Sequence, residues 1–137
     1  QLPPSLQFVS VDVEVFLAAL RKRYAGDVAL EPRHEAWFSP LCADVLKRYQ
    51  VARVAADPAV VPEAAEPGGW GQLVYWRLHG SPAIYRSSYS DTVLAVLADR
   101  IRRAQRSARA VWCIFDNTAL GAAVPDALAL RTRIANA

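Results

Sequence analysis

Apolar positions along the chain follow two spacings, a short one typical of strands and a longer one typical of helices. Short apolar runs predict four strands, at residues 28–31, 51–57, 73–79 and 110–115. Residues 1–4 resemble the tail of another strand, because two prolines stop it. Residues 58–71 are rich in Pro, Ala and Gly, which predicts a loop with at most one helical turn.

Four segments carry apolar residues at helical spacing. Their expected starts are Asp12, Ser39 followed by Pro40, Ser90 or Asp91, and Gly121. Ser before Pro is a strong start signal, because the hydroxyl caps free N–H groups and Pro has no N–H to leave unpaired. The expected buried faces of the first two helices consist of Val13, Phe16, Leu17, Leu20 and Tyr24, and of Leu41, Val45, Leu46 and Tyr49. The longest helix is expected to bury Leu94, Leu97, Ala98, Ile101 and Ala108.

Alternation of strands and helices predicts an α/β fold with parallel strands and right-handed crossovers. The 137 residues are enough for one domain, 1–137, with four strands and four helices. An eight-stranded (β/α)8 barrel, or TIM barrel, takes about 250 residues. The expected architecture is therefore the second half of such a barrel.

A half barrel leaves two strand edges without partners. We expect one of three outcomes: two copies form a homodimer that closes one barrel, the chain folds as an open layer, or it needs its missing N-terminal half. The sequence contains no Met and so, as written, cannot begin at a start codon. This favours a processed product or a piece of a longer protein.

The strand at 73–79 is unusual because it carries charge. Side chains alternate along a strand, so Tyr75, Arg77 and His79 share one face, while the opposite face is apolar. A charge beside an apolar core must be paired or must face a wet cavity. The pattern therefore fits either an Arg–carboxylate pair with a satisfied His that holds the fold, or a functional site.

Composition narrows the classes of protein only slightly. The chain is 53% hydrophobic and 21% charged, which is ordinary globular composition, and its net charge of +3 is too small to indicate nucleic acid by itself. No apolar run reaches the ~18 residues of a membrane helix, and the residues at Gln1 do not have the charged-then-apolar pattern of a signal segment. The predicted partners therefore do not include a membrane. Cys42 and Cys113 lack metal-type spacing, so free buried thiols and a reducing, cytoplasmic setting are expected.

Arginines on the longest helix have two interpretations. They are Arg100, Arg102, Arg103, Arg106 and Arg109. The simpler interpretation is that they form the solvent-exposed face of the helix. The more specific alternative is that they form a stripe that binds nucleic acid.

Polar residues follow every predicted strand. They are Glu31 and Arg33, then Asp57, then Arg77 and His79, then Asp116 and Asn117. In parallel α/β folds the carboxyl ends of the strands share one rim, where function gathers. The sequence therefore predicts a polar pocket at that rim.

The residue types suggest roles in this pocket. Glu31 or Asp57 could act as a general base or bind a divalent metal, although the metal is only weakly indicated. His79 could act as a general acid, a base or a ligand. Arg33 and Arg77 could form paired hydrogen bonds to a phosphate or carboxylate. The cofactor is otherwise unknown.

Three further residues complete the candidate site. Asn117 could donate to a developing oxyanion. Tyr85 and Tyr89 follow the strand and could cover a substrate, although ordinary loop packing explains them as well. Gly-rich phosphate loops and nucleophile elbows are absent from the sequence.

Several motifs in order resemble one family. They are QLPP at residues 1–4, EPRHEAW at 31–37, DP at 57–58, RLHG at 77–80 with Tyr85 and Tyr89-Ser90, and FDN at 115–117. Together they resemble the YecE-like family, also called domain of unknown function seventy-two. Ala36 stands where the family usually has Ser, and Asp116 replaces the first Asn of its F-N-N.

The resemblance implies an eight-unit barrel of which this chain carries the fifth to eighth strands. It also implies, by analogy with related barrels, a phosphate-bearing or sugar substrate handled by a metal-assisted hydrolase or isomerase. Two alternatives remain open. One is a non-catalytic module that binds phosphate or nucleic acid, and the other is an inactive half barrel that self-associates.

Overall fold

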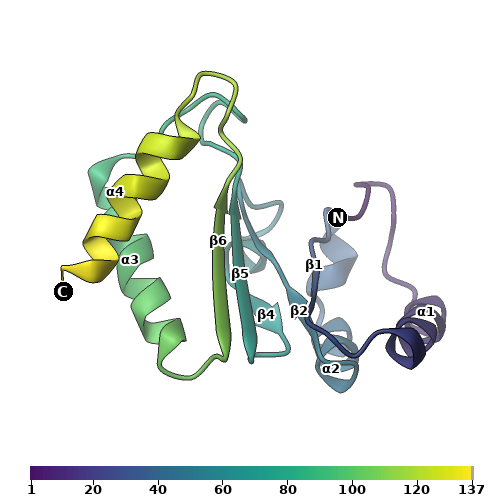
Figure 1. The fold of residues 1–137 in the computed structure, drawn as a ribbon. Helices are drawn as coiled ribbons and strands as arrows, with labels where there is room; N and C mark the ends of the chain where they lie inside the picture. Colours follow the sequence, from purple (N-terminus) through teal and green to yellow (C-terminus); the bar gives the residue numbers. More distant parts are fainter. Residues whose placement is uncertain (137) are drawn as a thin grey trace.

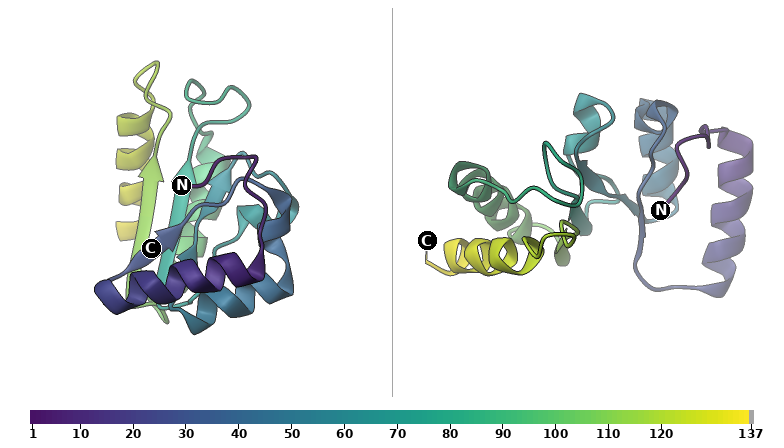
Figure 2. Two further views of the ribbon diagram at one scale, coloured as in Figure 1. Left: turned by 90° about the vertical axis from the view of Figure 1, so that its right-hand side faces the viewer. Right: turned by 90° about the horizontal axis from the view of Figure 1, so that it is seen from above.

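Helices surround a curved layer of short strands in residues 1–136, the part of the chain that the computed structural model describes (Figures 1 and 2). The helices are α1 (Ser10–Arg23), α2 (Pro40–Arg48), α3 (Asp91–Gln105) and α4 (Ala123–Ala135). The strands are β1 (Val28–Leu30), β2 (Val51–Arg53), β3 (Ala55–Asp57), β4 (Gly68–Gly69), β5 (Leu73–Leu78) and β6 (Ala110–Phe115). Two short 3-10 helices are η1 (Glu35–Phe38) and η2 (Pro62–Ala65). The prediction of an α/β fold with parallel strands and four helices is confirmed.

The strand pairings follow the chain order. β1 pairs in parallel with β2, β3 with β5, and β5 with β6. The expected single strand at 51–57 is two strands, because Val54 interrupts the pairing and donates its N–H to the carbonyl of Leu30 at 2.9 Å. β2 therefore belongs to the first sheet and β3 to the second. β4 pairs antiparallel with β2, a pairing that the Gly-rich loop did not predict.

Each of the two sheets has its own hydrophobic cluster. The first lies around α1, α2, β1 and β2 and is centred on Leu17, Leu46 and Val51. The second lies between β5 and the helices α3 and α4, where Trp76 and Leu78 of the strand meet Leu94, Leu97 and Ile101 of α3. Figure 2 shows, from above, that α1 and α2 lie at one end of the strand layer and α3 and α4 at the other.

Side-chain capping explains the starts of α2 and α3. Ser39 and Ser90 accept hydrogen bonds from the N–H groups of Cys42 and Val93, so both predicted caps are confirmed. The prediction for Asp12 is wrong, because α1 already begins at Ser10 after Val9, which makes no side-chain cap. The last helix begins at Ala123 rather than at Gly121, whose φ of 77° does not suit a helix.

Some expected buried residues are exposed. Phe16, Tyr24 and Leu41 are 59%, 49% and 58% exposed, so these predictions are wrong. α1 buries only the narrow face that carries Val13 and Leu17. Residues 1–4 form no strand, but the N–H of Leu2 donates to the carbonyl of Glu31 at 2.9 Å. This bond places the N-terminal segment beside the end of β1.

The two cysteines are free thiols as predicted, but only Cys42 is buried as expected, whereas Cys113 is half-buried. Burial raises the pKa of Cys42 to about 11, although the charge of Arg53 opposes the shift. Burial also raises the pKa of Cys113 to about 12. Both groups therefore stay protonated near neutral pH. No helix within residues 1–136 has the length and apolar character needed to span a membrane.

Candidate functional site

Charged side chains from both sheets meet at the carboxyl ends of the parallel strands. Glu31 follows β1, Arg77 and His79 lie at the end of β5, and Asp116 follows β6. Arg33 reaches the same group from the segment after β1. The predicted convergence of Glu31, Arg33, Arg77 and His79 is therefore present, and we call these four residues with Asp116 the rim cluster.

Glu31 is the centre of the rim cluster and is only 4% exposed. Its Oε1 lies 3.0 Å from Arg33 Nη2 and 3.2 Å from His79 Nε2, and its Oε2 accepts from Arg77 Nη1 at 2.9 Å. Burial raises the pKa of Glu31, but the hydrogen bonds from Arg77 and His79 and the charges of both arginines outweigh burial and hold that pKa below its ordinary value. Glu31 is therefore a carboxylate at neutral pH and the main acceptor of the cluster.

Arg77 joins the two sheets through its guanidinium. Besides Glu31, it donates to Asp116 Oδ2 at 2.7 Å and to Gln1 Oε1 at 2.6 Å. Burial lowers the pKa of Arg77, but the bonds to the two carboxylates raise it further than burial lowers it. Asp116, which replaces Asn in the family pattern, thus supplies a second negative charge. The contact of Gln1 was not anticipated, because nothing in the sequence near Gln1 indicated a partner 76 residues away.

His79 is 3% exposed and lies between two carboxylates. Its Nε2 is 3.1 Å from Arg33 Nη2 as well as 3.2 Å from Glu31 Oε1. Its Nδ1 is 3.1 Å from Asp116 Oδ2 but is not aligned for a hydrogen bond. Glu31 is therefore the carboxylate placed to exchange a proton with the ring, through Nε2.

Tyr85 covers the imidazole of His79. Their ring centroids are 5.7 Å apart with the planes at 83°, an edge-to-face arrangement. Tyr85 adopts a φ of 65°, which is uncommon for a residue with a side chain, and its N–H donates to the carbonyl of His79 at 2.5 Å. The loop after β5 therefore holds Tyr85 over the rim cluster.

Three other predicted site residues lie in a separate group behind this loop. Tyr89 donates from its hydroxyl to Asp57 Oδ2 at 2.7 Å and accepts from the N–H of Gly80 at 2.8 Å. Burial, followed by the bond to Asp57, raises the pKa of Tyr89 well above its ordinary range. Both groups are thus already paired within the fold.

Asn117 is completely buried and contacts the same loop. Its Nδ2 donates to the carbonyl of Ser87 at 2.9 Å and to Asp126 Oδ2 at 2.7 Å. Asp126, only 5% exposed, also accepts from the N–H of Tyr89 at 3.1 Å. The sequence analysis missed Asp126 because an acidic residue in the first turn of a helix is ordinary.

A pocket of about 190 Å³ opens beside the rim cluster. Glu31, Arg33 and His79 form its polar wall. The remaining wall is mainly apolar and consists of Pro32, Phe38, Val54, Ala56, Pro58, Ala59, Val60, Ala64 and Ile84. Within residues 1–136 no group of three or more His, Cys, Asp or Glu side chains is arranged to hold a metal ion. Glu31, Asp57 and His79, which the sequence offered as possible ligands of a divalent metal, thus do not form one ligand set.

These observations describe a parallel α/β protein with a charged cluster and a small pocket at the strand ends. The model of the family "protein of unknown function DUF72" matches residues 1–137, so the chain belongs to this family. No curated protein matches the chain.

Solved structures of DUF72 proteins share the fold. A DUF72 protein from Thermotoga maritima MSB8 is 24% identical with a TM-score of 0.81, over 99% of this chain and 56% of that one. A DUF72 protein from Enterococcus faecalis V583 is 22% identical with a TM-score of 0.79, over 100% of this chain and 60% of that one. The chain therefore spans somewhat more than half the length of the solved proteins it matches.

Proposed function

We propose that the pocket beside the rim cluster binds a small hydroxylated ligand of the sugar class. The main support for this proposal is the lining of the pocket. Three buried or half-buried polar side chains, Glu31, Arg33 and His79, form one wall of a pocket that is otherwise apolar. Binding sites for small molecules commonly combine apolar walls with a few placed polar groups. A sugar ring has matching apolar faces and hydroxyl edges.

Charge balance favours a neutral ligand over a phosphate. Arg33 and Arg77 are opposed by Glu31 and Asp116, so the rim cluster has no net charge when His79 is neutral. A phosphate would have to compete with these carboxylates for the same guanidinium donors. A hydroxyl group can donate to a carboxylate and accept from an arginine, so it fits without breaking either pair. Arg33 Nη1 has no partner within residues 1–136 and supplies a free donor.

An enzymatic role would rest on His79 and Glu31. The imidazole of His79 is close enough to Glu31 to exchange a proton, and histidine is the side chain that most often acts as a general acid or base in enzymes. Glu31 would orient the ring and balance its charge. A phosphate-bearing ligand is the second candidate, because Arg33 remains able to donate to an anion.

Titration calorimetry with neutral monosaccharides, the matching sugar phosphates and inorganic phosphate tests this proposal. We expect saturable binding of a neutral sugar that Arg33→Gln weakens about tenfold, as loss of a hydrogen bond to a charged group predicts. Arg86→Gln, which changes an exposed arginine in the loop after β5, is the matched control and should leave binding unchanged. Binding of phosphate without any neutral sugar would favour the second candidate, and binding of neither would reject both.

We further propose that the chain is half of a barrel and that another polypeptide closes it. Within residues 1–136, β1 pairs only with β2, and β6 pairs only with β5. Trp112 lies opposite Tyr75 in the middle of the edge strand β6 and is 54% exposed. The solved relatives are longer than this chain, which also supports a missing part.

Light scattering in solution tests closure by a second copy. We expect twice the mass of one chain, and Trp112→Asp should shift the protein toward the monomer by placing a charge in the covered face. Leu120→Asp, at a 72% exposed position outside the sheet, should leave the mass unchanged. A monomer at all concentrations would contradict self-association.

A further inference from the structure

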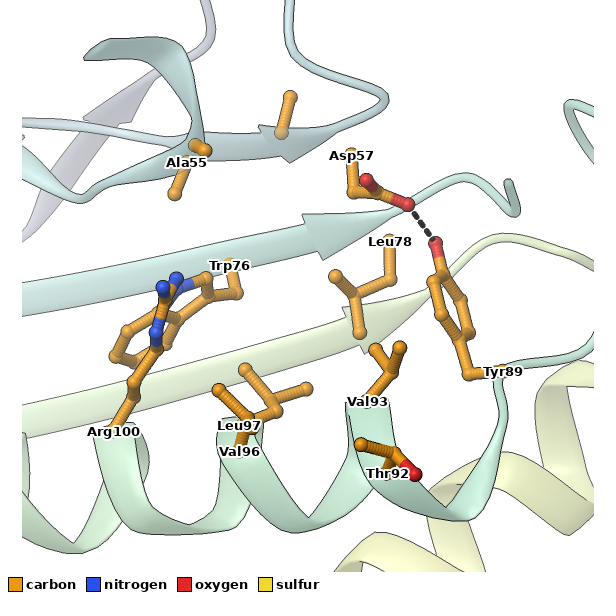
Figure 3. A pocket seen from close by; sticks show the side chains of 12 residues that line it. Ala55, Asp57, Trp76, Leu78, Tyr89, Thr92, Val93, Val96, Leu97 and Arg100 are labelled. Atoms are coloured by element: carbon orange, nitrogen blue, oxygen red, sulfur yellow. Dashed lines mark hydrogen bonds between the residues drawn. The ribbon is translucent and has the colours of Figure 1, made fainter. Parts of the chain in front are cut away.

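A second pocket lies on the opposite face of β5 from the rim cluster, between the strands and α3 (Figure 3). Its volume is about 280 Å³. Trp76 and Leu78 form the strand side, and Val93, Val96 and Leu97 form the helix side. Arg77 and His79 alternate with Trp76 and Leu78 along β5, so the two pockets are separated by the sheet.

The pocket exists because one crossover lacks a full helix. Parallel strands such as β3 and β5 are usually joined through an α-helix that covers the sheet. Here the connection contains only η2 and β4, and its contribution to the pocket wall is the small residue Ala65. Ala55 and Ala56 of β3 also leave space. Val93 and Val96 of α3 remain 46% and 49% exposed as a result.

The two ends of the pocket differ in charge. Asp57 lies at one end, where it accepts the hydrogen bond of Tyr89, and Arg100 lies at the other (Figure 3). A shallower groove continues past Trp76 and Arg100 to Arg103.

Arg103 donates only to the carbonyl of Asp99 within residues 1–136, and Arg100 pairs with the half-exposed Glu66. Exposed ion pairs are weak, so a ligand anion can compete with Glu66 for Arg100. Within the described residues 1–136 the indole Nε1 of Trp76 is also buried without a hydrogen-bond partner, which favours a ligand with an oxygen acceptor.

We propose that this pocket binds a medium-length alkyl carboxylate, with the tail between β5 and α3 and the carboxylate at Arg100 and Arg103. The volume is about twice the ~150 Å³ of an apolar cavity that holds benzene. Ten helical residues separate Val93 from Arg103, a length of about 15 Å, which suits an extended chain rather than a compact ring. The carboxylate of Asp57 opposes the reverse orientation by charge repulsion.

Titration of the full chain with hexanoate, octanoate and decanoate tests this site by calorimetry and by tryptophan fluorescence. Affinity should rise about fourfold for each added methylene group, as burial of one CH₂ predicts. Decanoate should bind at least tenfold more tightly than 1-decanol, because the alcohol lacks the charge for Arg100 and Arg103.

Substitutions locate the binding. Ala65→Leu should fill the pocket and weaken decanoate at least tenfold, and Arg103→Gln should weaken it about fivefold. Arg106→Gln, which changes a neighbouring exposed arginine outside the pocket, should have no effect. Val96→Asp, at an exposed position of the same wall, provides a second test if Ala65→Leu does not fold. Affinity independent of chain length, equal binding of decanol, or unchanged affinity in a folded Ala65→Leu or Val96→Asp protein would each overturn the proposal.

Discussion

Replacing Glu31 with glutamine is expected to lower the free energy of unfolding by about 3 kcal/mol at pH 7, the scale for breaking a buried ion pair. The substitution leaves Arg77 and Arg33 without the carboxylate that both contact. It also removes the negative partner of His79 Nε2. Urea unfolding followed by circular dichroism measures the change.

The pH dependence of this effect has a definite sign. The pKa of Glu31 in the fold lies below its ordinary value of 4.5, so the ionised carboxylate stabilises the fold fully above about pH 4.5. This stabilisation is lost as the pH falls through the lower pKa of the folded state. The difference between the wild type and Glu31→Gln should therefore be largest at pH 7 and smaller at pH 3. Glu66→Gln, which removes an exposed partner of Arg100, should cost less than about 1 kcal/mol at either pH.

Asp126→Ala is expected to destabilise the fold by about 3 kcal/mol, because two buried donors lose their acceptor. These donors are the backbone N–H of Tyr89 and the Nδ2 of Asn117. The loop that holds Tyr85 over His79 should loosen at the same time. Faster hydrogen exchange at the amide of Tyr89, measured by NMR, would report this loosening together with the change in unfolding free energy.

An exposed aspartate on the neighbouring helix is the control for Asp126. Asp91 lies in the first turn of α3, is 91% exposed and pairs with Arg133. Asp91→Ala should leave the Tyr89 amide protected and change stability little. An Asp126→Ala protein as stable as Asp91→Ala would show that the buried bonds do not hold the loop.

The fold was predictable where the pattern of apolar and polar residues fitted only one type of secondary structure. Ser39 with Pro40 marked the start of α2, and the alternation along 73–79 correctly separated Trp76 and Leu78 from Arg77 and His79. The break at Val54 was not predictable, because pairing with two different neighbours leaves no mark in the sequence of the segment. Phe16 is exposed because no element packs against that side of α1 within residues 1–136. The spacing of apolar residues within the helix does not indicate which of them will find a packing partner.

The candidate site was predictable in its location and less so in its connections. Shared strand ends correctly brought Glu31, Arg77 and His79 together. The separate group that contains Asn117 was not predictable. Its residues follow the ends of the strands, where side chains no longer alternate between the two faces of the sheet. The resemblance to the DUF72 family is confirmed by the family match, whereas the YecE-like name and the restriction to the second half of a barrel remain predictions.

Arg77 has a consequence for the shape of the whole molecule. Its guanidinium, on the second sheet, binds Glu31 at the end of the first, and the segment 51–57 contributes one strand to each sheet. The same hydrogen bonds thus join the two sheets and help to set the charge of the pocket wall. A ligand that competes with Arg77 for Glu31 would also weaken this link between the sheets.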